Sequence, residues 1–171
     1  ANKKIKVFSI MRDSYVNING RGDDKITHAY YFGGPQLAVR TINENFGLNI
    51  RDFVTVNFFG LEKIIDYLGG VEINVKESEI TVINSYINEL SELEGKPAHH
   101  ITKAGKQNLT GMQAVAYSRN RYTGNGDYER TDRQRRVLDA LMNKILAQGA
   151  TKYPGLVSEL LPFVNTSLSN T

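Results

Sequence analysis

The chain has 171 residues, of which 40% are hydrophobic and 23% charged, values that describe an ordinary globular protein and exclude a disordered one. It has no cysteine, which excludes disulfides, thiolate metal sites and a cysteine nucleophile. No apolar run approaches about 18 residues, so the sequence predicts no membrane-spanning helix.

The net charge is only +3, but it is distributed unevenly along the chain. Six of the ten arginines fall within residues 119–136, whereas residues 62–94 hold eight acidic residues against two lysines. Clustered guanidinium groups repel one another, and their planar forks match phosphate and carboxylate groups. The stretch therefore predicts a local site for an anionic ligand rather than a general coating for nucleic acid.

The first half of the chain alternates strand and helix patterns. A strand is expected over residues 5–11, ending at Arg12 and Asp13, and a second over Tyr15–Ile18. Gly33-Gly34-Pro35 predicts the start of a helix that ends at Gly47. The expected elements that follow are a strand over 53–57, a helix over 58–68 closed by two glycines, and a strand over 71–75. This alternation predicts an α/β fold with a mixed sheet and packed helices.

The second half is predicted to be mainly helical. A helix is plausible over residues 80–93, and Thr110-Gly-Met-Gln113 is a capping box that starts another. A long helix is expected over 128–148, with Asp127 as its N-cap and Gly149 as its stop. The expected domain organisation is a single domain over 1–171 that is truncated at its N-terminus, with a frayed tail over 165–171.

Helix phase divides the arginines of the long helix. At about 100° per residue, an apolar stripe runs through Val137, Leu138, Leu141 and Ile145, and it places Arg130 and Gln134 on the core-facing side. A buried arginine needs a carboxylate partner or a ligand. These two residues are therefore expected either to bind an anion beside the helix N-terminus or simply to satisfy buried groups such as Asp127. The remaining arginines of the helix are expected on a solvated face, namely Arg133, Arg135 and Arg136.

Arg119 and Arg121 are two residues apart, after the predicted end of a helix. In an extended segment such residues point the same way, although two solvated surface arginines are the commoner outcome. Arg12 and Asp13 lie where α/β sheets place ligands, at the end of a strand. The sequence has no phosphate-binding glycine loop, no nucleophile elbow and no zinc-protease motif.

Several segments, in order, resemble the LytR-CpsA-Psr (LCP) family. The resemblance covers about residues 3–146 and is carried by SIMRDSYV at 9–16, DKITHAY at 24–30, GGP at 33–35, FFG at 58–60, IDYLGGV at 65–71, LTGMQA at 109–114, YSRNR at 117–121 and GDYERTDRQ at 126–134. It implies a mixed central sheet flanked by helices on both faces, with the N-terminal strands missing from this chain.

The resemblance also implies a function and a site. Members look like phosphotransferases that move a glycopolymer, such as teichoic acid or capsule, from a polyprenyl pyrophosphate carrier to peptidoglycan. They work on the extracellular face of the membrane, held by an N-terminal transmembrane helix that lies outside this sequence. By this resemblance the pyrophosphate would be bound by Arg12, Arg119, Arg121, Arg130 and Gln134, with Lys25 and Asp127 nearby and Asp13 as a candidate base.

Two departures from the family pattern stand out. Met11 replaces a frequent proline, and the upstream segment with an acidic residue used for Mg²⁺ is absent, so the sequence leaves the metal ligands unknown. Two alternatives to the enzyme are a regulator that binds nucleic acid through outward-facing arginines, which we do not expect, and a module that binds the lipid without turnover.

Overall fold

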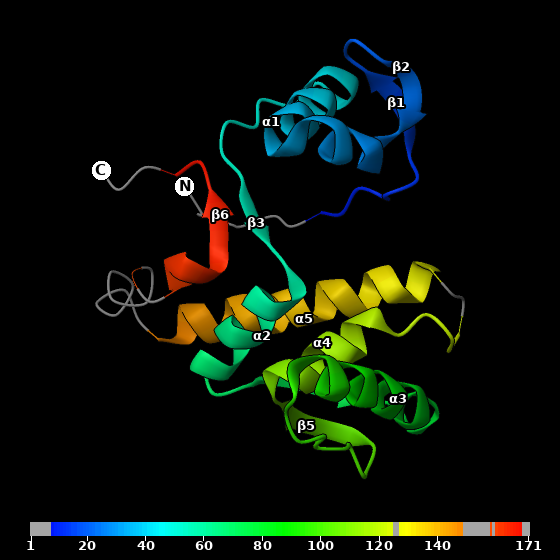
Figure 1. Cartoon of the computed structure of the whole chain (residues 1–171), viewed down its shortest axis with the longest axis vertical. Helices are drawn as coiled ribbons and strands as arrows, with labels where there is room; N and C mark the ends of the chain where they lie inside the picture. Colours follow the sequence, from blue (N-terminus) through cyan, green and yellow to red (C-terminus); the bar gives the residue numbers. More distant parts are fainter. Residues whose placement is uncertain (1–7, 125–126, 149–157, 159, 169–171) are drawn as a thin grey trace, which may run out of the picture. The chain divides into compact units, whose positions relative to one another are not determined.

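The computed structural model describes residues 8–124, 127–148, 158 and 160–168. The chain forms two compact units, unit 1 over Ala1–Thr55 and Asn165–Thr171 and unit 2 over Val56–Val164. The predicted α/β class is confirmed (Figure 1). In the described residues the strands form three two-stranded ladders, which pair β1 with β2, β3 with β6 and β4 with β5.

Unit 1 is built from a hairpin and a bent helix. β1 (Tyr15–Ile18) pairs antiparallel with β2 (Gly22–Lys25), and α1 (Ile26–Phe46) follows at once and packs on β1. The predicted helix after Gly34 and its stop at Gly47, with φ 63°, are confirmed. The helical turns over 26–32 were not predicted. They are separated from the rest of α1 by non-helical backbone at Gly33 and Gly34, next to Pro35.

The first predicted strand, over 5–11, is not found in its described part. Residues 5–7 lie outside the described residues, and Phe8–Met11 adopt no strand conformation. Apolar alternation alone does not make a strand, because a strand needs a neighbour for its backbone hydrogen bonds. Arg12 and Asp13 instead occupy a turn, in which the amide of Ser14 donates to the carbonyl oxygen of Met11 at 3.0 Å.

The strand predicted over 53–57 is confirmed as β3 (Val54–Val56), which pairs with β6 (Val164–Thr166). The start of the expected frayed tail over 165–171 therefore belongs to a strand, while residues 169–171 lie outside the described part. Polar side chains hold this segment in place. The Thr166 hydroxyl and the Ser167 amide both donate to the carbonyl oxygen of Phe53, at 2.7 and 3.2 Å.

Unit 2 contains most of the apolar core. Its described elements are α2 (Phe58–Tyr67), β4 (Val71–Val75), α3 (Glu77–Glu94), β5 (Gly105–Leu109), α4 (Gly111–Arg119), α5 (Asp127–Ala147) and the short 3₁₀ turn η2 (Leu161–Phe163). These confirm the helices predicted over 58–68, 80–93 and 128–148 and the strand over 71–75. The predicted N-cap, Asp127, is the first residue of α5, and the predicted stop, Gly149, lies outside the described residues.

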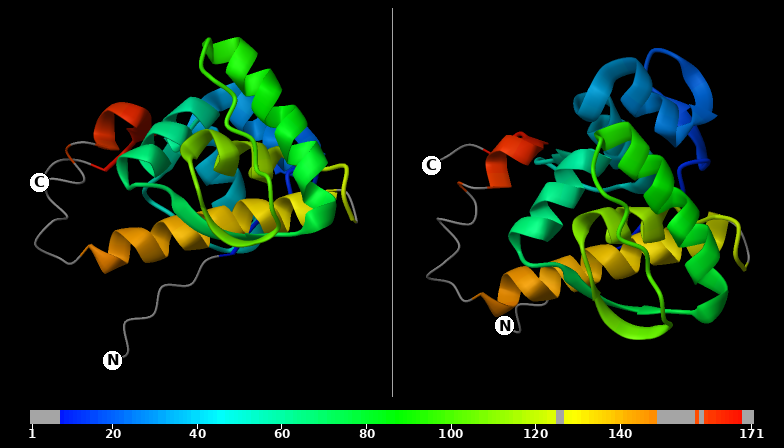
Figure 2. Two further views of the ribbon diagram at one scale, coloured as in Figure 1. Left: turned by 90° about the horizontal axis from the view of Figure 1, so that it is seen from below. Right: turned by 60° about the horizontal axis from the view of Figure 1, so that its bottom comes forward.

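α4 is the central element of unit 2. It contacts α2, α3 and α5 (Figure 2), and seven of its nine residues are buried. The predicted capping box starts it, since the Thr110 hydroxyl accepts from the amide of Gln113 and the Gln113 side chain accepts from the amide of Thr110. Within the described ranges, no helix combines the length and the apolar character that crossing a membrane requires.

Candidate functional site

The face of α5 that packs into unit 2 differs from the predicted one. Arg133 and Val137 are each 1% exposed, whereas Leu138 is 42% exposed. Gln134 is exposed, Arg130 and Arg135 are partly buried, and Arg136 is exposed. The prediction was wrong for Arg133, which is in the core, and for Gln134, which is not. The prediction counted Leu138 as a core residue, and this shifted the expected buried face of α5 around the helix axis.

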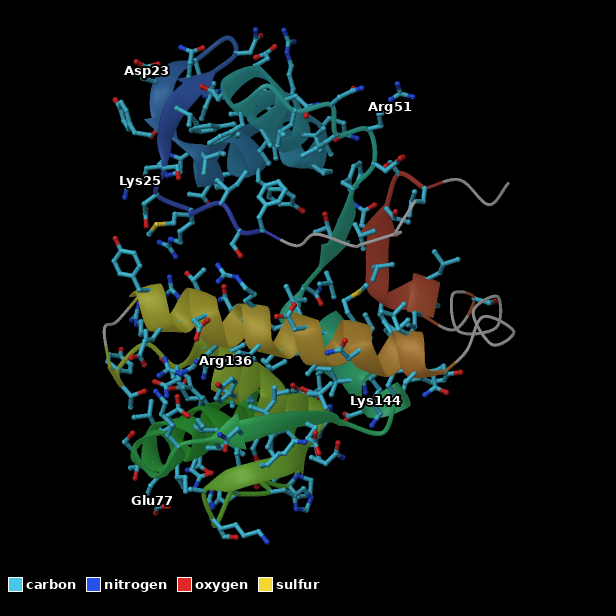
Figure 3. All side chains as sticks on the ribbon, turned by 180° about the vertical axis from the view of Figure 1, so that it is seen from behind. Asp23, Lys25, Arg51, Glu77, Arg136 and Lys144 are labelled. Carbon is cyan, nitrogen blue, oxygen red and sulfur yellow. The ribbon has the colours of Figure 1, made fainter. Side chains whose placement is uncertain are left out.

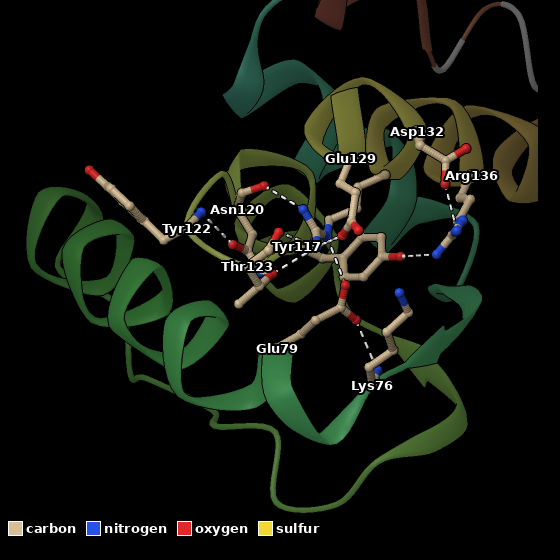
Figure 4. A network of polar contacts seen from close by, with 10 residues as sticks. Lys76, Glu79, Tyr117, Asn120, Tyr122, Thr123, Glu129, Asp132 and Arg136 are labelled. Carbon is tan, nitrogen blue, oxygen red and sulfur yellow. Dashed lines mark hydrogen bonds and ion pairs between the residues drawn. The ribbon is translucent and has the colours of Figure 1, made fainter. Parts of the chain in front are cut away.

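Arg133 can be buried because carboxylates lie within its reach. Its Nε donates to Glu79 Oε1 at 2.8 Å, and Glu79 itself is 1% exposed. Its Nη2 donates to Glu129 Oε2 at 2.8 Å and to the Thr123 hydroxyl at 2.8 Å, and its Nη1 donates to the carbonyl oxygen of Asn120 at 2.8 Å (Figure 4). This arrangement neutralises the buried guanidinium and gives each of its three nitrogens an acceptor.

The network joins three segments around the connection between α4 and α5. Glu79 belongs to the first turn of α3, where its Oε2 also accepts from the amide of Lys76 at 2.9 Å. Asn120 and Thr123 follow α4, and Arg133 belongs to α5. Because Arg133 bonds this connection directly, the residues after α4 lie against the first turns of α5. The predicted ligand-binding residues Arg121 and Arg130 therefore belong to neighbouring segments.

Arg119 is the last residue of α4 and reaches toward α3. Its Nη2 lies 3.4 Å from Glu89 Oε2, and its guanidinium carbon lies 4.8 Å from the centre of the Tyr86 ring and 5.9 Å from that of Phe58. Its side chain is 31% exposed. Ring faces and one carboxylate thus orient the cation while leaving part of it open to solvent.

Arg121 follows the C-cap residue Asn120, which has extended backbone with φ −61° and ψ 116°. The predicted end of the helix near Ser118 is therefore confirmed to within one residue. Arg121 is exposed, and its Nη2 donates to the Tyr122 hydroxyl at 3.2 Å. A common direction for Arg119 and Arg121 stays a prediction.

Unit 1 carries the other predicted group of charges. Asp13 lies between two cations, with its Oδ1 3.0 Å from Lys25 Nζ and its Oδ2 3.4 Å from Arg12 Nε. The hydrogen bond from Lys25, supported by the charges of Lys25 and Arg12, lowers the pKa of the Asp13 carboxyl. Between β2 and α1, the imidazole of His28 lies 2.7 Å from Asp24 Oδ2, and this hydrogen bond lowers the pKa of the Asp24 carboxyl. Figure 3 shows the position of Lys25 in unit 1.

Arg136 confirms the prediction of a solvated position but also has a buried partner. Its side chain is 45% exposed, pairs with Asp132 at 2.5 Å and donates to the hydroxyl of buried Tyr117 at 3.2 Å. Burial raises the pKa of the Tyr117 hydroxyl, which therefore stays neutral and can accept this bond. Figure 3 shows Arg136 and Lys144 along α5 in unit 2.

A divalent cation has no ready ligand set in the described residues. No three histidine or acidic side chains there come together in a way that could hold a metal. Asp13, the candidate base, already faces Lys25 and Arg12. These two positive charges disfavour a metal ion at this carboxylate.

The sequence interpretation missed the residues that support the site. Glu79, Asn120, Thr123 and Glu129 were not singled out, although Glu79 lies in the acidic stretch that had no assigned role. The sequence signal that could have identified these supporting residues was the balance of positive and negative charges. A long helix with many arginines needs carboxylates if any of them is buried, and the acidic residues of 62–94 could supply one.

Comparison with known proteins identifies relatives over nearly the whole chain. The model of the LytR_cpsA_psr family matches residues 1–171. A protein of Enterococcus faecalis named polyisoprenyl-teichoic acid–peptidoglycan teichoic acid transferase TagU is 34% identical over 171 residues, which cover 98% of this chain and 51% of that protein. The regulatory protein MsrR of Staphylococcus aureus is 34% identical over 170 residues, which cover 98% of this chain and 47% of MsrR.

A solved structure shares the fold. TagT bound to LI-WTA superposes with a TM-score of 0.69 and 32% identity, covering 94% of this chain and 56% of TagT. The chain thus spans about half the length of the relatives it matches.

Proposed function

The chain belongs to the LytR-CpsA-Psr family, and from this we propose that it forms part of a phosphotransferase that moves a glycopolymer of teichoic acid or capsule type from a polyprenyl pyrophosphate carrier to peptidoglycan. One observation carries the proposal. A relative named as a teichoic acid transferase aligns with 98% of this chain at 34% identity. The solved complex of TagT with LI-WTA, which matches 94% of the chain, supports it.

The proposed reaction needs little covalent chemistry from the protein. A hydroxyl oxygen of peptidoglycan attacks the phosphorus that carries the glycan, and the bond from that phosphorus to the bridging oxygen breaks. The products are a phosphodiester between peptidoglycan and the glycopolymer, and a polyprenyl phosphate. Charge on the leaving group is the main obstacle, and guanidinium groups stabilise such charge.

By resemblance to the family, the residues proposed to contact the pyrophosphate are Arg12, Lys25, Arg119, Arg121, Arg130 and Gln134. The open part of Arg119 and the exposed positions of Arg121 and Gln134 support this assignment. Asp127 begins α5, whose N-terminal amides favour an anion.

Asp13 is proposed to accept or direct the proton of the attacking hydroxyl. Its lowered pKa keeps it ionised, which favours orientation of the hydroxyl over strong basicity.

Mg²⁺ is proposed to assist the reaction, but no residue of this chain is assigned as its ligand. Mg²⁺ is commonly held by one or two carboxylates together with substrate phosphates, where it neutralises developing charge. Asp13, the carboxylate proposed beside the pyrophosphate, already faces Lys25 and Arg12. We therefore derive no step of the reaction from the ion. Addition of Mg²⁺ to the 171-residue chain is expected to leave its melting temperature unchanged.

The proposed setting is the extracellular face of the cell membrane. The named substrates of the Enterococcus faecalis relative, teichoic acid and peptidoglycan, are envelope polymers. An N-terminal anchor outside this sequence is part of the proposal by resemblance to the family.

Loss of Arg130 tests the assignment. Arg130→Ala is expected to abolish binding of a polyprenyl pyrophosphate in detergent, with an unchanged melting temperature. In turnover, as distinct from binding, one such contact contributes about 3 kcal/mol to transition-state stabilisation. The matched control is Arg40→Ala, since Arg40 is 56% exposed and pairs with Glu44 on α1. Unchanged binding in Arg130→Ala, measured by titration, would reject the assignment.

Turnover separates an enzyme from a lipid carrier. The protein that includes this chain is incubated with a lipid-linked glycan and peptidoglycan, and the glycan covalently attached to peptidoglycan is measured. Product that requires Arg130 supports the transferase, whereas binding without product supports a module that only carries or senses the lipid.

A nucleic-acid-binding regulator is the weaker reading, despite the name of the Staphylococcus aureus relative. Such binding would use the arginines of 119–136 as one outward strip, but Arg133 is 1% exposed and is neutralised by Glu79 and Glu129. A gel shift that depends on DNA sequence would favour the regulator.

A further inference from the structure

Arg133 is the largest fully buried side chain in the described residues, and it lies beside the loop that carries Arg121. We infer that Arg133 is a positioning residue, which holds the Asn120–Thr123 loop in the shape that presents Arg121 to the pyrophosphate. This inference rests on the proposed function. It assigns to Arg133 a role that differs from that of the anion-binding arginines around it.

The geometry uses the whole guanidinium fork. Nε bonds Glu79 on α3, Nη1 bonds the carbonyl oxygen of Asn120, and Nη2 bonds the carbonyl oxygen and hydroxyl of Thr123 at 3.2 and 2.8 Å. Arg133 thus bonds the loop at Asn120 and at Thr123, which lie on either side of Arg121. A lysine could not reproduce this, because its three donors radiate from one nitrogen.

The loop also has bonds of its own that complete its shape. The Asn120 side chain donates to the Thr123 hydroxyl at 2.9 Å and accepts from the amide of Tyr122 at 3.1 Å. The Tyr122 ring stacks on Tyr86 of α3, with ring centres 6.4 Å apart and planes at 17°. Asn120 is fully buried, so the bond from Arg133 to its carbonyl oxygen satisfies a group that water cannot reach.

The charge of Arg133 is used inside the protein. Glu79 and Glu129 both lie 2.8 Å from its nitrogens, and its side chain is 2% exposed. An anionic ligand therefore gains little from this cation directly. The affinity for an anion depends on Arg133 through the placement of Arg121, which is exposed on the loop.

Trypsin offers a readout of the loop that does not require activity. Trypsin cleaves after arginine, and its access to the Arg121–Tyr122 bond requires the loop to open. Arg133→Lys is expected to increase the rate of cleavage at this bond about tenfold, the effect on local opening of losing one hydrogen bond to a charged group. The control is Arg136→Lys, since Arg136 bonds Tyr117 and Asp132 rather than the loop. Fragments are identified by mass spectrometry, and an unchanged rate in Arg133→Lys overturns the inference.

A double-mutant cycle links the loop to the ligand. Arg133→Lys is expected to weaken binding of a polyprenyl pyrophosphate about tenfold, the effect of losing one hydrogen bond to a charged group, and to weaken it no further when Arg121 is already alanine. Fully additive losses would show that Arg133 does not act through Arg121, and would overturn the inference. A wild-type chain that binds no pyrophosphate rejects the proposed function together with this role in binding, whereas cleavage alone decides whether Arg133 holds the loop.

A milder variant covers the case in which Arg133→Lys does not fold. Thr123→Val keeps the shape of the side chain and removes the hydroxyl that accepts from both Arg133 and Asn120. It leaves the buried pair of Arg133 and Glu79 in place. Faster cleavage at Arg121–Tyr122 with an unchanged melting temperature supports the inference, and unchanged cleavage counts against it.

Discussion

Lys25 Nζ lies 3.0 Å from Asp13 Oδ1, and this hydrogen bond is the main reason why the pKa of Asp13 is below its ordinary value. A lowered folded-state pKa stabilises the fold above the unfolded-state pKa, about 3.9, and this contribution is lost as the pH falls through the folded-state pKa.

The first prediction concerns this pair. Lys25→Met should raise the pKa of Asp13 toward its ordinary value, because the largest cause of the shift is removed. The measurement is a pH titration of the carboxyl carbon by NMR, with Lys103→Met, an exposed lysine of unit 2, as the control. A pKa of Asp13 that stays where it is in the wild type would show that Arg12 rather than Lys25 lowers it.

The second prediction concerns Glu62, whose side chain is 3% exposed and whose partner is Lys96 Nζ at 2.6 Å. Burial raises the pKa of Glu62, and Lys96 opposes that rise. Lys96→Met should reduce the free energy of unfolding by about 1–3 kcal/mol, since it leaves a buried carboxyl without its cation. Lys106→Met is the control, because its pair with Glu72 is exposed on both sides and contributes about 0–1 kcal/mol.

The sign of the pH dependence sharpens this test. A raised folded-state pKa means that stability is fully present below the unfolded-state pKa and is lost as the pH rises through the folded-state pKa. The loss in free energy of unfolding caused by Lys96→Met should therefore be larger near about pH 7, where Glu62 is ionised, than near about pH 4.5. Urea unfolding at both pH values measures it, and an equal deficit at both would contradict the assignment.

The third prediction concerns the close approach of α4 to α2. A Cβ on Gly111 would overlap the backbone carbonyl of Glu62, and backbone cannot rotate away. Gly111→Ala should therefore destabilise the fold by about 1–3 kcal/mol through overpacking. Gly20→Ala provides the contrast, because nothing lies within 4 Å of the added atom and only its positive φ of 77° is strained. Denaturant midpoints compare the two, and an equal loss would show that packing at Gly111 is not the cause.

The fourth prediction concerns Glu89, whose carboxylate lies 3.4 Å from Arg119 Nη2. This carboxylate competes with an anionic ligand for the guanidinium. Glu89→Gln should strengthen binding of a polyprenyl pyrophosphate about two- to fivefold, equivalent to a surface pair of about 0.4–1 kcal/mol. Glu92→Gln, an exposed change on the same helix, is the control. Weaker binding in Glu89→Gln would mean that Glu89 orients Arg119 rather than competing for it.

Local signals in the sequence predicted most of the described helices of unit 2. The capping box at Thr110, the paired glycines after α2 and the alternation in β4 each depend on neighbouring residues, and each appears in the structure. The strand expected at Phe8–Met11 and the fraying expected at Asn165 and Thr166 were wrong, because strand formation depends on a partner strand. Such partners are distant in the sequence, as Phe53 and Thr166 illustrate.

The site was predictable in composition and only partly in geometry. The sequence placed cations at the end of α4 and at the start of α5, and both positions hold. It exchanged the environments of Arg133 and Gln134, because helix phase rests on which apolar residues are taken as buried. Leu138 is 42% exposed, and no local pattern distinguishes it from Val137. The fully buried partner of Arg133, Glu79, lies 54 residues away, so the burial of Arg133 could not be inferred from the helix alone.

That separation of 54 residues between Glu79 and Arg133 has a consequence for folding. The loop after α4 is fixed by a side chain that arrives only with α5, and that side chain needs a carboxylate made much earlier in the chain. Contacts between distant residues form late, because the intervening chain must first be ordered. We therefore expect the loop that carries Arg121 to become ordered only when α5 has packed, so that a chain folded short of α5 presents no assembled loop to a ligand.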